Sequence, residues 1–223
     1  MKEGRYKIAS IVEGPGEAEA VPKLLARWFV ENGLYDFDPL PSIRANGRDK
    51  IKGKYDLKRR MGIEYYVDIA MSEEPDAMLV ILDADDKEKG SRGKQGKPDC
   101  PKVLGPNLLA RAQAVCPHIP LGVVLAYKEY EAWFLYILPE LQRAGMIPKG
   151  IKLPTYKSDK EIPRGCKERL SSFMTEPYEP TRHQAIFTRY LPFNDKMKSR
   201  SRSYRHLLDT LDRLALDARN REI

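Results

Sequence analysis

The stretch Met78-Leu79-Val80-Ile81-Leu82-Asp83-Ala84-Asp85-Asp86 decides the fold that this chain is expected to adopt. Its apolar run, Leu79 to Leu82, is typical of a strand that is buried on both faces, as in a parallel sheet. The carboxylates Asp83, Asp85 and Asp86 follow at once, and like charges at short range favour a neutralising cation. Open α/β sheets bind ligands at the carboxyl ends of their strands, so the sequence predicts a Mg²⁺ or Mn²⁺ site there. Because aspartate is also common in turns after strands, a simple turn is the alternative.

The length suits one α/β domain with additions, or one domain and a small subdomain, and the composition is that of a soluble globular protein. The 223 residues are 42% hydrophobic and 32% charged, and the formal net charge is +7. No apolar run of about 18 residues is present and the first residues do not resemble a secretory leader, so we expect a cytoplasmic protein with no membrane partner. The excess of basic residues favours a polyanionic partner, although solubility alone would also explain it.

The cysteine and histidine residues indicate neither a disulfide framework nor a zinc site. Cys100, Cys116 and Cys166 are odd in number and far apart, and the three histidines are equally scattered. Neither set has the spacing that zinc ligands show. The acidic stretch is therefore the candidate metal site of this chain.

Hydrophobic runs predict three more strands, with helical patterns between them. The runs cover residues 6–12, 37–43 and 121–126. The alternation predicts a mostly parallel, four-stranded sheet with helices on both faces, the Rossmann-like arrangement of an α/β fold. Residues 1–142 are expected to form this domain, and residues 143–223 a helical extension packed on it, since prolines divide that part into short helices.

The first helix is constrained by Pro22, which fits best in a first helical turn, so we expect the helix to begin between Glu17 and Ala20. The next helix is expected over residues 55–71, although Gly62 interrupts its pattern. Further helices are expected over residues 107–115, 166–174, 181–191 and 203–216.

Other carboxylates should lie near Asp83, because the carboxyl ends of parallel strands meet at one edge of a sheet. Glu13 follows the first strand, Glu17 comes one helical turn later, and Glu131 follows the last strand. With strands about 4.8 Å apart, such side chains can converge on two metal ions roughly 3.5–4 Å apart, as in phosphoryl-transfer sites. Glutamates in a first helical turn also interact well with the helix dipole, and that structural role is the alternative for Glu131.

Two basic segments are suited to hold the backbone of a nucleic acid through its phosphates. One follows the acidic stretch and the other precedes the last helix. Their residues are Lys87, Lys89, Arg92 and Lys94 in the loop 87–102, and Lys198, Arg200, Arg202 and Arg205 in the segment 196–205. A loop as long as the first is typically either functional or mobile, so a solvated basic loop is the alternative for it.

These motifs resemble those of the Toprim domain, which occurs in topoisomerases, primases and the nuclease half of the OLD family. In that family an acidic residue and a glycine follow the first strand and Asp-x-Asp follows a later one, which correspond here to Glu13-Gly14 and Asp83-Ala84-Asp85. The closer resemblance is to an uncharacterised Toprim-like bacterial family that is often encoded beside an ATPase gene. The shared motifs lie at residues 12–17, 82–86, 128–133 and 203–208, so that the resemblance covers nearly the whole chain. It implies a Toprim-like fold and a metal site, and only by extension a reaction.

The leading hypothesis is a Mg²⁺- or Mn²⁺-dependent nuclease or nickase that acts on DNA, with RNA as the second choice. Its catalytic residues would be Glu13, Asp83 and Asp85. Its metal ligands would be Glu13, Glu17, Asp83, Asp85, Asp86 and Glu131. The rival hypothesis is a non-catalytic Toprim-like module that binds nucleic acid or protein, and chemistry on nucleotides or small phosphoesters is a third alternative.

A partner ATPase is expected on three grounds. The short, proline-separated helices after Arg143 could form a docking surface, although helices that merely cover the sheet of a self-sufficient enzyme are the alternative. The chain has neither a Walker A motif nor the glycine fingerprint of a dinucleotide fold, so it has no recognisable nucleotide-driven element of its own. The family that it resembles is often encoded beside an ATPase gene. The sequence leaves the oligomeric state open, and a homo-oligomer is compatible with it.

Overall fold

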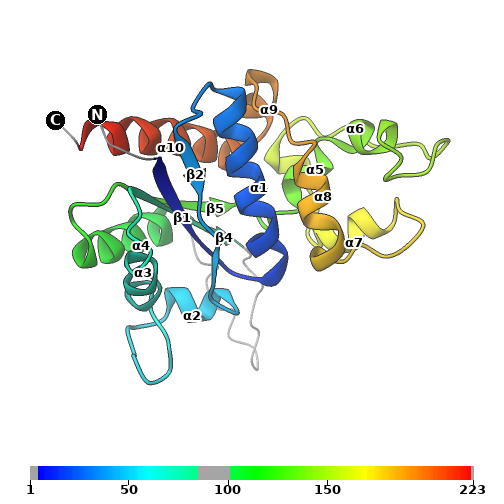
Figure 1. The fold of residues 1–223 in the computed structure, drawn as a ribbon. Helices are drawn as coiled ribbons and strands as arrows, with labels where there is room; N and C mark the ends of the chain where they lie inside the picture. Colours follow the sequence, from blue (N-terminus) through cyan, green and yellow to red (C-terminus); the bar gives the residue numbers. More distant parts are fainter. Residues whose placement is uncertain (1–4, 85–100, 222–223) are drawn as a thin grey trace, which may run out of the picture.

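The computed structural model describes residues 5–84 and 101–221, and within them five strands form one parallel sheet (Figure 1). The strands are β1 (Tyr6–Val12), β2 (Phe37–Pro39), β3 (Ile43–Arg44), β4 (Ala77–Asp83) and β5 (Leu121–Ala126). The order across the sheet is β2-β1-β4-β5, and β3 pairs with the end of β1. The pairings between these strands are parallel. The predicted α/β fold with a parallel sheet, consistent with a Rossmann-like arrangement, is therefore confirmed.

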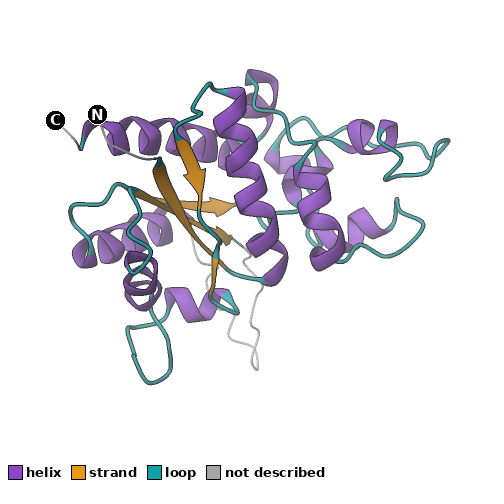
Figure 2. Cartoon of the chain, in the orientation of Figure 1, coloured by secondary structure: helices purple, strands orange, loops and turns teal. Residues whose placement is uncertain are grey.

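Helices cover both faces of the sheet and continue beyond it (Figure 2). On or near the sheet lie α1 (Pro15–Glu31), α2 (Arg48–Lys52), α3 (Ile63–Met71), α4 (Pro101–Val115) and α10 (Arg202–Asn220). The connection between β5 and α10 holds α5 (Ala132–Leu135), α6 (Leu138–Arg143), the 3₁₀ helix η1 (Asp159–Glu161), α7 (Cys166–Ser171), the π-helical turn η2 (Pro180–Gln184), α8 (Ala185–Thr188) and α9 (Asp195–Arg200). Within the described ranges, no helix is long and apolar enough to cross a membrane.

The alternation of side chains along the strands builds two hydrophobic cores, one on each face of the sheet. In β4, Leu79 and Ile81 belong to the core shared with α1 and α10, whereas Val80 and Leu82 belong to the core shared with α3 and α4. None of these four side chains is more than 1% exposed. The continuous apolar run of β4 is therefore explained by the helices that cover both of its faces.

The predicted start of the first helix is wrong. α1 begins at Pro15, and Pro22 lies inside the helix. The Glu17 side chain fixes this earlier start, because its carboxylate accepts a hydrogen bond of 3.0 Å from the backbone N–H of Gly14, the residue that precedes the helix. An interior proline costs roughly 3 kcal/mol of helix stability. Burial of the apolar face around it, with Leu24 fully buried, offsets that cost.

The helix predicted over residues 55–71 is wrong in its first half. α3 begins only at Ile63, directly after Gly62, whose φ is +96°. The chain before it forms a turn that is closed by backbone hydrogen bonds of 2.9 and 3.0 Å between Asp56 and Met61. Because a glycine adopts positive φ at little cost, the interruption that Gly62 makes in the apolar pattern marks the true boundary of the helix.

The remaining elements differ from the prediction mainly in their boundaries. The strand predicted over residues 37–43 is split into β2 and β3, and both pair with β1 at the edge of the sheet, where a proline such as Pro39 is tolerated. The helix predicted over residues 181–191 is likewise split into η2 and α8. The sequence pattern does not predict α9, whose first turn is capped by the Asn194 side chain, which accepts a hydrogen bond of 3.0 Å from the Met197 N–H.

One hydrophobic core continues past residue 142 into the following helices. It includes Trp133 of α5, which packs edge to face on Tyr204 of α10 with ring centroids 5.3 Å apart. Both side chains are fully buried. The division of the chain into residues 1–142 and 143–223 stays a prediction, and in the structure both parts contribute to this core.

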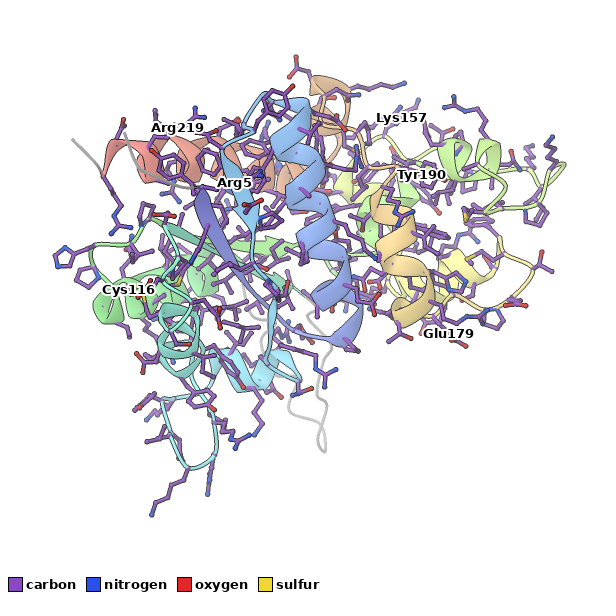
Figure 3. The ribbon with its side chains drawn as sticks, viewed as in Figure 1. Arg5, Cys116, Lys157, Glu179, Tyr190 and Arg219 are labelled. Carbon is purple, nitrogen blue, oxygen red and sulfur yellow. The ribbon has the colours of Figure 1, made fainter. Side chains whose placement is uncertain are left out.

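The two ends of the described chain meet beside the outer strand β2. Arg219 Nη2 of α10 lies 2.5 Å from Asp36 Oδ1, and Arg5 Nε lies 2.7 Å from Asp38 Oδ2. Figure 3 labels both arginines toward the same end of the sheet. The last helix thus packs on one face of the sheet, and its Arg219 is also joined by an ion pair to the residue just before β2.

Candidate functional site

Glu13 and Asp83 lie at the carboxyl ends of β1 and β4, two neighbouring strands between which the strand order reverses. From β1 the chain passes to β2 on one side, and it then crosses to β4 on the other side of β1. Glu13 directly follows β1, and Asp83 is the last residue of β4. In open α/β sheets, ligands bind at the carboxyl ends of the strands at such a switch point. The structure therefore brings these two predicted site residues to the edge where a ligand is expected.

Asp83 is held in place by the segment that follows β5. Its Oδ1 accepts a hydrogen bond of 2.7 Å from the Tyr130 backbone N–H, and its Oδ2 lies 3.9 Å from Lys167 Nζ. The side chain is only 13% exposed. Burial, and then the nearby Glu131 carboxylate, raise the pKa of Asp83 well above its usual value, whereas Lys167 lowers it. The charged form of Asp83 is therefore costly unless a cation stays close.

Lys167 of α7 is the cation that the structure places among these carboxylates. Its Nζ lies 3.0 Å from Glu131 Oε2, 3.4 Å from Glu129 Oε2 and 3.9 Å from Asp83 Oδ2. Burial lowers the pKa of Lys167, but the three carboxylates outweigh it and hold that pKa above its usual value. One ammonium group thus balances part of the charge of three acidic side chains.

Glu131 is the most deeply buried carboxylate of the group, with 0% exposure. Its Oε1 accepts a hydrogen bond of 3.1 Å from the Tyr178 hydroxyl, and its Oε2 faces Lys167. Burial raises the pKa of Glu131 to about 7, even though the ammonium of Lys167 lowers it. A fraction of Glu131 therefore carries a proton at neutral pH, and added positive charge would favour its ionised form.

Glu13 has a buried oxygen, Oε2, with no hydrogen-bond partner among the described residues. Burial and then the Glu17 charge raise the pKa of Glu13, although the backbone N–H groups of Arg48 and Asp83 lower it. An unpaired buried carboxylate oxygen costs free energy. This atom therefore fits a position beside a bound cation or a substrate proton.

Glu17 makes structural hydrogen bonds with both of its carboxylate oxygens. Its Oε2 accepts the capping hydrogen bond from Gly14, and its Oε1 accepts a hydrogen bond of 3.1 Å from Gln184 Nε2. The residue is 8% exposed. Glu17 thus joins α1 to η2, and it acts on the acidic site through its charge, which raises the pKa of Glu13.

The donor set fits a hard divalent cation, although the present side-chain positions do not yet form a metal site. Within residues 5–84 and 101–221, no group of three or more His, Cys, Asp or Glu side chains is arranged to hold an ion. The predicted ligands Asp85 and Asp86 lie outside the described residues. Carboxylate oxygens are the ligands that Mg²⁺ and Mn²⁺ prefer, and three carboxylates around one ammonium leave negative charge to neutralise. The described residues that would hold the ion are Glu13, Asp83 and Glu131.

The basic residues predicted to hold phosphates are brought together only in part. Lys198 Nζ lies 3.3 Å from Asp209 Oδ1 and 3.9 Å from Asp212 Oδ2, so carboxylates of α10 balance its charge. Arg205 is exposed on α10. The predicted residues of the loop after β4 all lie outside the described residues: Lys87, Lys89, Arg92 and Lys94.

A cavity of about 940 Å³ lies between α4, β5 and the start of α10. Val123 and Leu125 of β5 give it an apolar lining, and Arg200 and Arg202 add positive charge. Tyr127, the first residue after β5, also lines it, so the cavity reaches the carboxyl edge of the sheet. Two of the predicted phosphate-binding residues therefore stand beside a space that can admit an anionic ligand.

The sequence pattern does not point to Lys167, Tyr178 or Gln184, yet each of them contacts a predicted carboxylate. All three come from the part of the chain after residue 142. A buried acidic group needs a positive counter-charge, but no spacing rule tells which lysine supplies it. The helical part of the chain thus contributes directly to the site.

No protein-family model, curated protein or solved structure matches this chain. The resemblance to Toprim domains, the reaction, the metal and the partners accordingly stay predictions from the sequence.

Proposed function

We propose that this chain is a Mg²⁺- or Mn²⁺-dependent phosphodiester hydrolase of the Toprim type, a nuclease or nickase that acts on DNA, with RNA as the second choice of substrate. The observation that carries the proposal is the gathering of Glu13, Asp83 and Glu131, all with raised pKa values, at the switch point of a parallel sheet. Titratable groups with perturbed pKa values are frequent at functional sites, and open α/β sheets bind ligands at this edge. The sequence adds Asp85 and Asp86 as further expected ligands.

The roles of the residues follow from their surroundings. A divalent ion held by these carboxylates would supply a polarised water and neutralise charge on the scissile phosphate. Glu13 would be either a metal ligand or a general base, and its raised pKa and unpaired Oε2 suit the second role, in which it would accept a proton from the attacking water. Glu17 fixes the start of α1 and thereby the turn that carries Glu13. Arg200 and Arg202 would hold the nucleic-acid backbone through its phosphates.

A nicking assay on supercoiled plasmid, with Mn²⁺, Mg²⁺ or EDTA, tests the proposal. We expect cleavage with Mn²⁺ or Mg²⁺, none with EDTA, and a loss of activity in Asp83→Asn and in Glu13→Gln. Asp68→Asn is the matched control, because Asp68 is an exposed aspartate on α3 and should retain full activity. Cleavage that is insensitive to EDTA, or equal in all four proteins, would contradict the proposed site.

The second candidate function is a non-catalytic Toprim-like module that binds nucleic acid or protein. Lys167 favours it, because an ammonium group 3.0 Å from Glu131 and 3.9 Å from Asp83 already balances part of the acidic charge without a metal. Calorimetric titration with Mn²⁺ separates the two functions. A catalytic site should bind the ion and lose that binding in Asp83→Asn, whereas the binding module should show no specific uptake.

A partner ATPase belongs to the same proposal. The helices between β5 and α10 are short, and in Figure 1 α5 to α8 extend to one side of the sheet, where they offer a surface for docking. The family that the sequence resembles is often encoded beside an ATPase gene. A DNA substrate and such a partner would both be met in the cytoplasm, which is the proposed location of the chain. Co-expression with the neighbouring gene product, followed by size exclusion and nicking assays with and without ATP, tests this part. Full metal-dependent cleavage by the chain alone, unchanged by the neighbouring gene product, would contradict the partner hypothesis and leave the nuclease hypothesis standing.

A further inference from the structure

Lys167 reaches the acidic edge of the sheet from α7, a helix far from the strands along the chain. Lys167 lies in the first turn of α7, next to Cys166, which is fully buried. The Ser171 hydroxyl donates a hydrogen bond of 2.9 Å to the Lys167 carbonyl oxygen, and the Tyr178 backbone N–H donates one of 2.8 Å to that Ser171 hydroxyl. The backbone of Lys167 is thus fixed by neighbours that do not depend on its ammonium group.

The ammonium group stands where a cation for these carboxylates would be placed. It is within 4 Å of oxygens of Glu129, Glu131 and Asp83, at 3.4, 3.0 and 3.9 Å. Two of these carboxylates, Glu131 and Asp83, were predicted from the sequence as metal ligands. Two like-charged cations a few ångströms apart in a site of low polarity repel each other strongly. The lysine and a divalent ion cannot both occupy the centre of this group at low cost.

We infer that Lys167 is a resident counter-ion that a divalent cation must displace, so that Lys167 sets the metal concentration at which the acidic site fills. This inference rests on the proposed metal-dependent function and adds a form of regulation to it. At low metal concentration the ammonium group balances part of the carboxylate charge and occupies the position that the ion would take. At higher concentration the ion takes Asp83 and Glu131, and the ammonium group moves out.

The side chain has a route by which it can leave. Lys167 is 34% exposed, whereas its partners Glu129 and Glu131 are 9% and 0% exposed. A lysine ends in a compact charge on a flexible four-carbon stem, so its head group can turn to solvent while the backbone stays in place. The carboxylates remain fixed in that exchange, because Asp83 is held by the Tyr130 N–H and Glu131 by the Tyr178 hydroxyl.

Calorimetric titration of Mn²⁺ into four proteins tests the inference: wild type, Lys167→Met, Lys167→Arg and Lys149→Met. We expect Lys167→Met to bind Mn²⁺ at least about tenfold more tightly than wild type, which is the size of effect expected for one close, partly buried charge partner. Lys167→Arg keeps the competing charge and should bind no more tightly than wild type. Lys149→Met removes one exposed positive charge elsewhere in the same part of the chain and should stay within about twofold of wild type.

The outcomes separate this inference from the proposed function. Wild type that binds Mn²⁺ as tightly as Lys167→Met overturns the inference and leaves the metal site standing. No specific binding by wild type and by Lys167→Met overturns both. A second measurement uses the wild-type protein, so it holds even if Lys167→Met does not fold. An amine-reactive reagent acetylates exposed lysines, and mass spectrometry then quantifies the modified peptides. Saturating Mn²⁺ should accelerate labelling of Lys167 but not of Lys149, and an unchanged rate at Lys167 overturns the inference.

Discussion

Asp83 at the end of β4 accepts a hydrogen bond of 2.7 Å from the backbone N–H of Tyr130, which lies in the segment that follows β5. This bond ties together two neighbouring strand ends at the edge where the acidic residues gather. Tyr130 is itself fully buried, and its ring packs on Trp133 with centroids 4.7 Å apart. The position of the Asp83 carboxylate is therefore set by the core and not by a flexible loop.

Asp83→Asn should weaken Mn²⁺ binding while leaving the fold intact. The asparagine side-chain oxygen can still accept the hydrogen bond from Tyr130, and a neutral group avoids the burial cost that raises the pKa of Asp83. We expect the free energy of unfolding of the metal-free variant at pH 8 to lie within about 1 kcal/mol of wild type or above it. Urea unfolding in EDTA measures the stability, with Asp68→Asn as the control. A loss of several kcal/mol would show that the charge on Asp83 supports the fold.

The metal-free protein should lose stability as the pH rises from about 4.5 to about 7. The pKa of Glu131 is raised by burial from its ordinary value of 4.5 to about 7, so in this window the folded state binds more protons than the unfolded state. Stability falls with pH wherever the folded state holds the extra proton. The raised pKa of Asp83 adds to the same trend. The effect of Glu131 is at most about 3 kcal/mol.

Chemical unfolding at several pH values in EDTA measures this slope, and Glu131→Gln should flatten it. Glu140→Gln is the control, because Glu140 lies on α6 and its side chain is 40% exposed. An equal slope in wild type and Glu131→Gln would show that Glu131 is not the group that titrates.

The sheet is predictable from the sequence, and the reason is visible in β4. Its uninterrupted apolar run needs helices on two faces, and the alternation of Leu79 and Val80 between two cores is what a parallel sheet requires. The predicted element boundaries that were wrong lie where two local sequence signals conflict and tertiary contacts decide between them. Pro22 argues against the early helix start that the hydrogen bond from the Gly14 N–H to Glu17 favours, and no propensity rule ranks those two signals. Packing of the helix face decides between them.

Gly122→Ala should destabilise the protein through one identifiable clash. A Cβ at Gly122 of β5 would lie 2.3 Å from Thr210 Cγ2 on α10, and both residues are buried. We expect a loss of about 1–3 kcal/mol in the free energy of unfolding, as for overpacking in other cores. Thr210→Ser removes the clashing methyl group, so it should recover most of the loss when it is combined with Gly122→Ala. A double-mutant cycle in urea measures that coupling, and additive effects would contradict the proposed contact.

Nucleic-acid binding, if it uses the predicted basic segment, should depend on Arg200 and Arg202 more than on Lys198. Both arginines line the cavity beside β5, whereas Lys198 is paired with Asp209. The slope of log K against log salt on duplex DNA should fall by about 0.9 for each phosphate contact removed. Arg200→Gln with Arg202→Gln should lower the slope, and Lys198→Gln, as the matched control, should leave it nearly unchanged. Fluorescence anisotropy over a range of salt concentrations measures both.

Only the residues of the site that directly follow strands are predictable from the sequence. Glu13 and Asp83 follow apolar runs, and any parallel sheet brings such residues to one edge. Lys167 and Tyr178 carry no comparable signal, because their approach to Glu131 depends on how short helices pack after residue 142. Glu17 shows the opposite case, in which a residue predicted as a ligand uses both oxygens in structural hydrogen bonds.

The anchoring of α10 has a consequence for how the protein is made on the ribosome. The strands are synthesised well before α10, yet one face of the sheet is covered by α10 residues as late as Ala218, and Arg219 is joined to Asp36 beside β2. While that helix is still inside the exit tunnel, the emerging chain must expose Leu79 and Ile81 on an unfinished sheet. The nascent protein therefore cannot reach its native state before α10 has left the tunnel, and until then it offers a hydrophobic surface to the cell's chaperones.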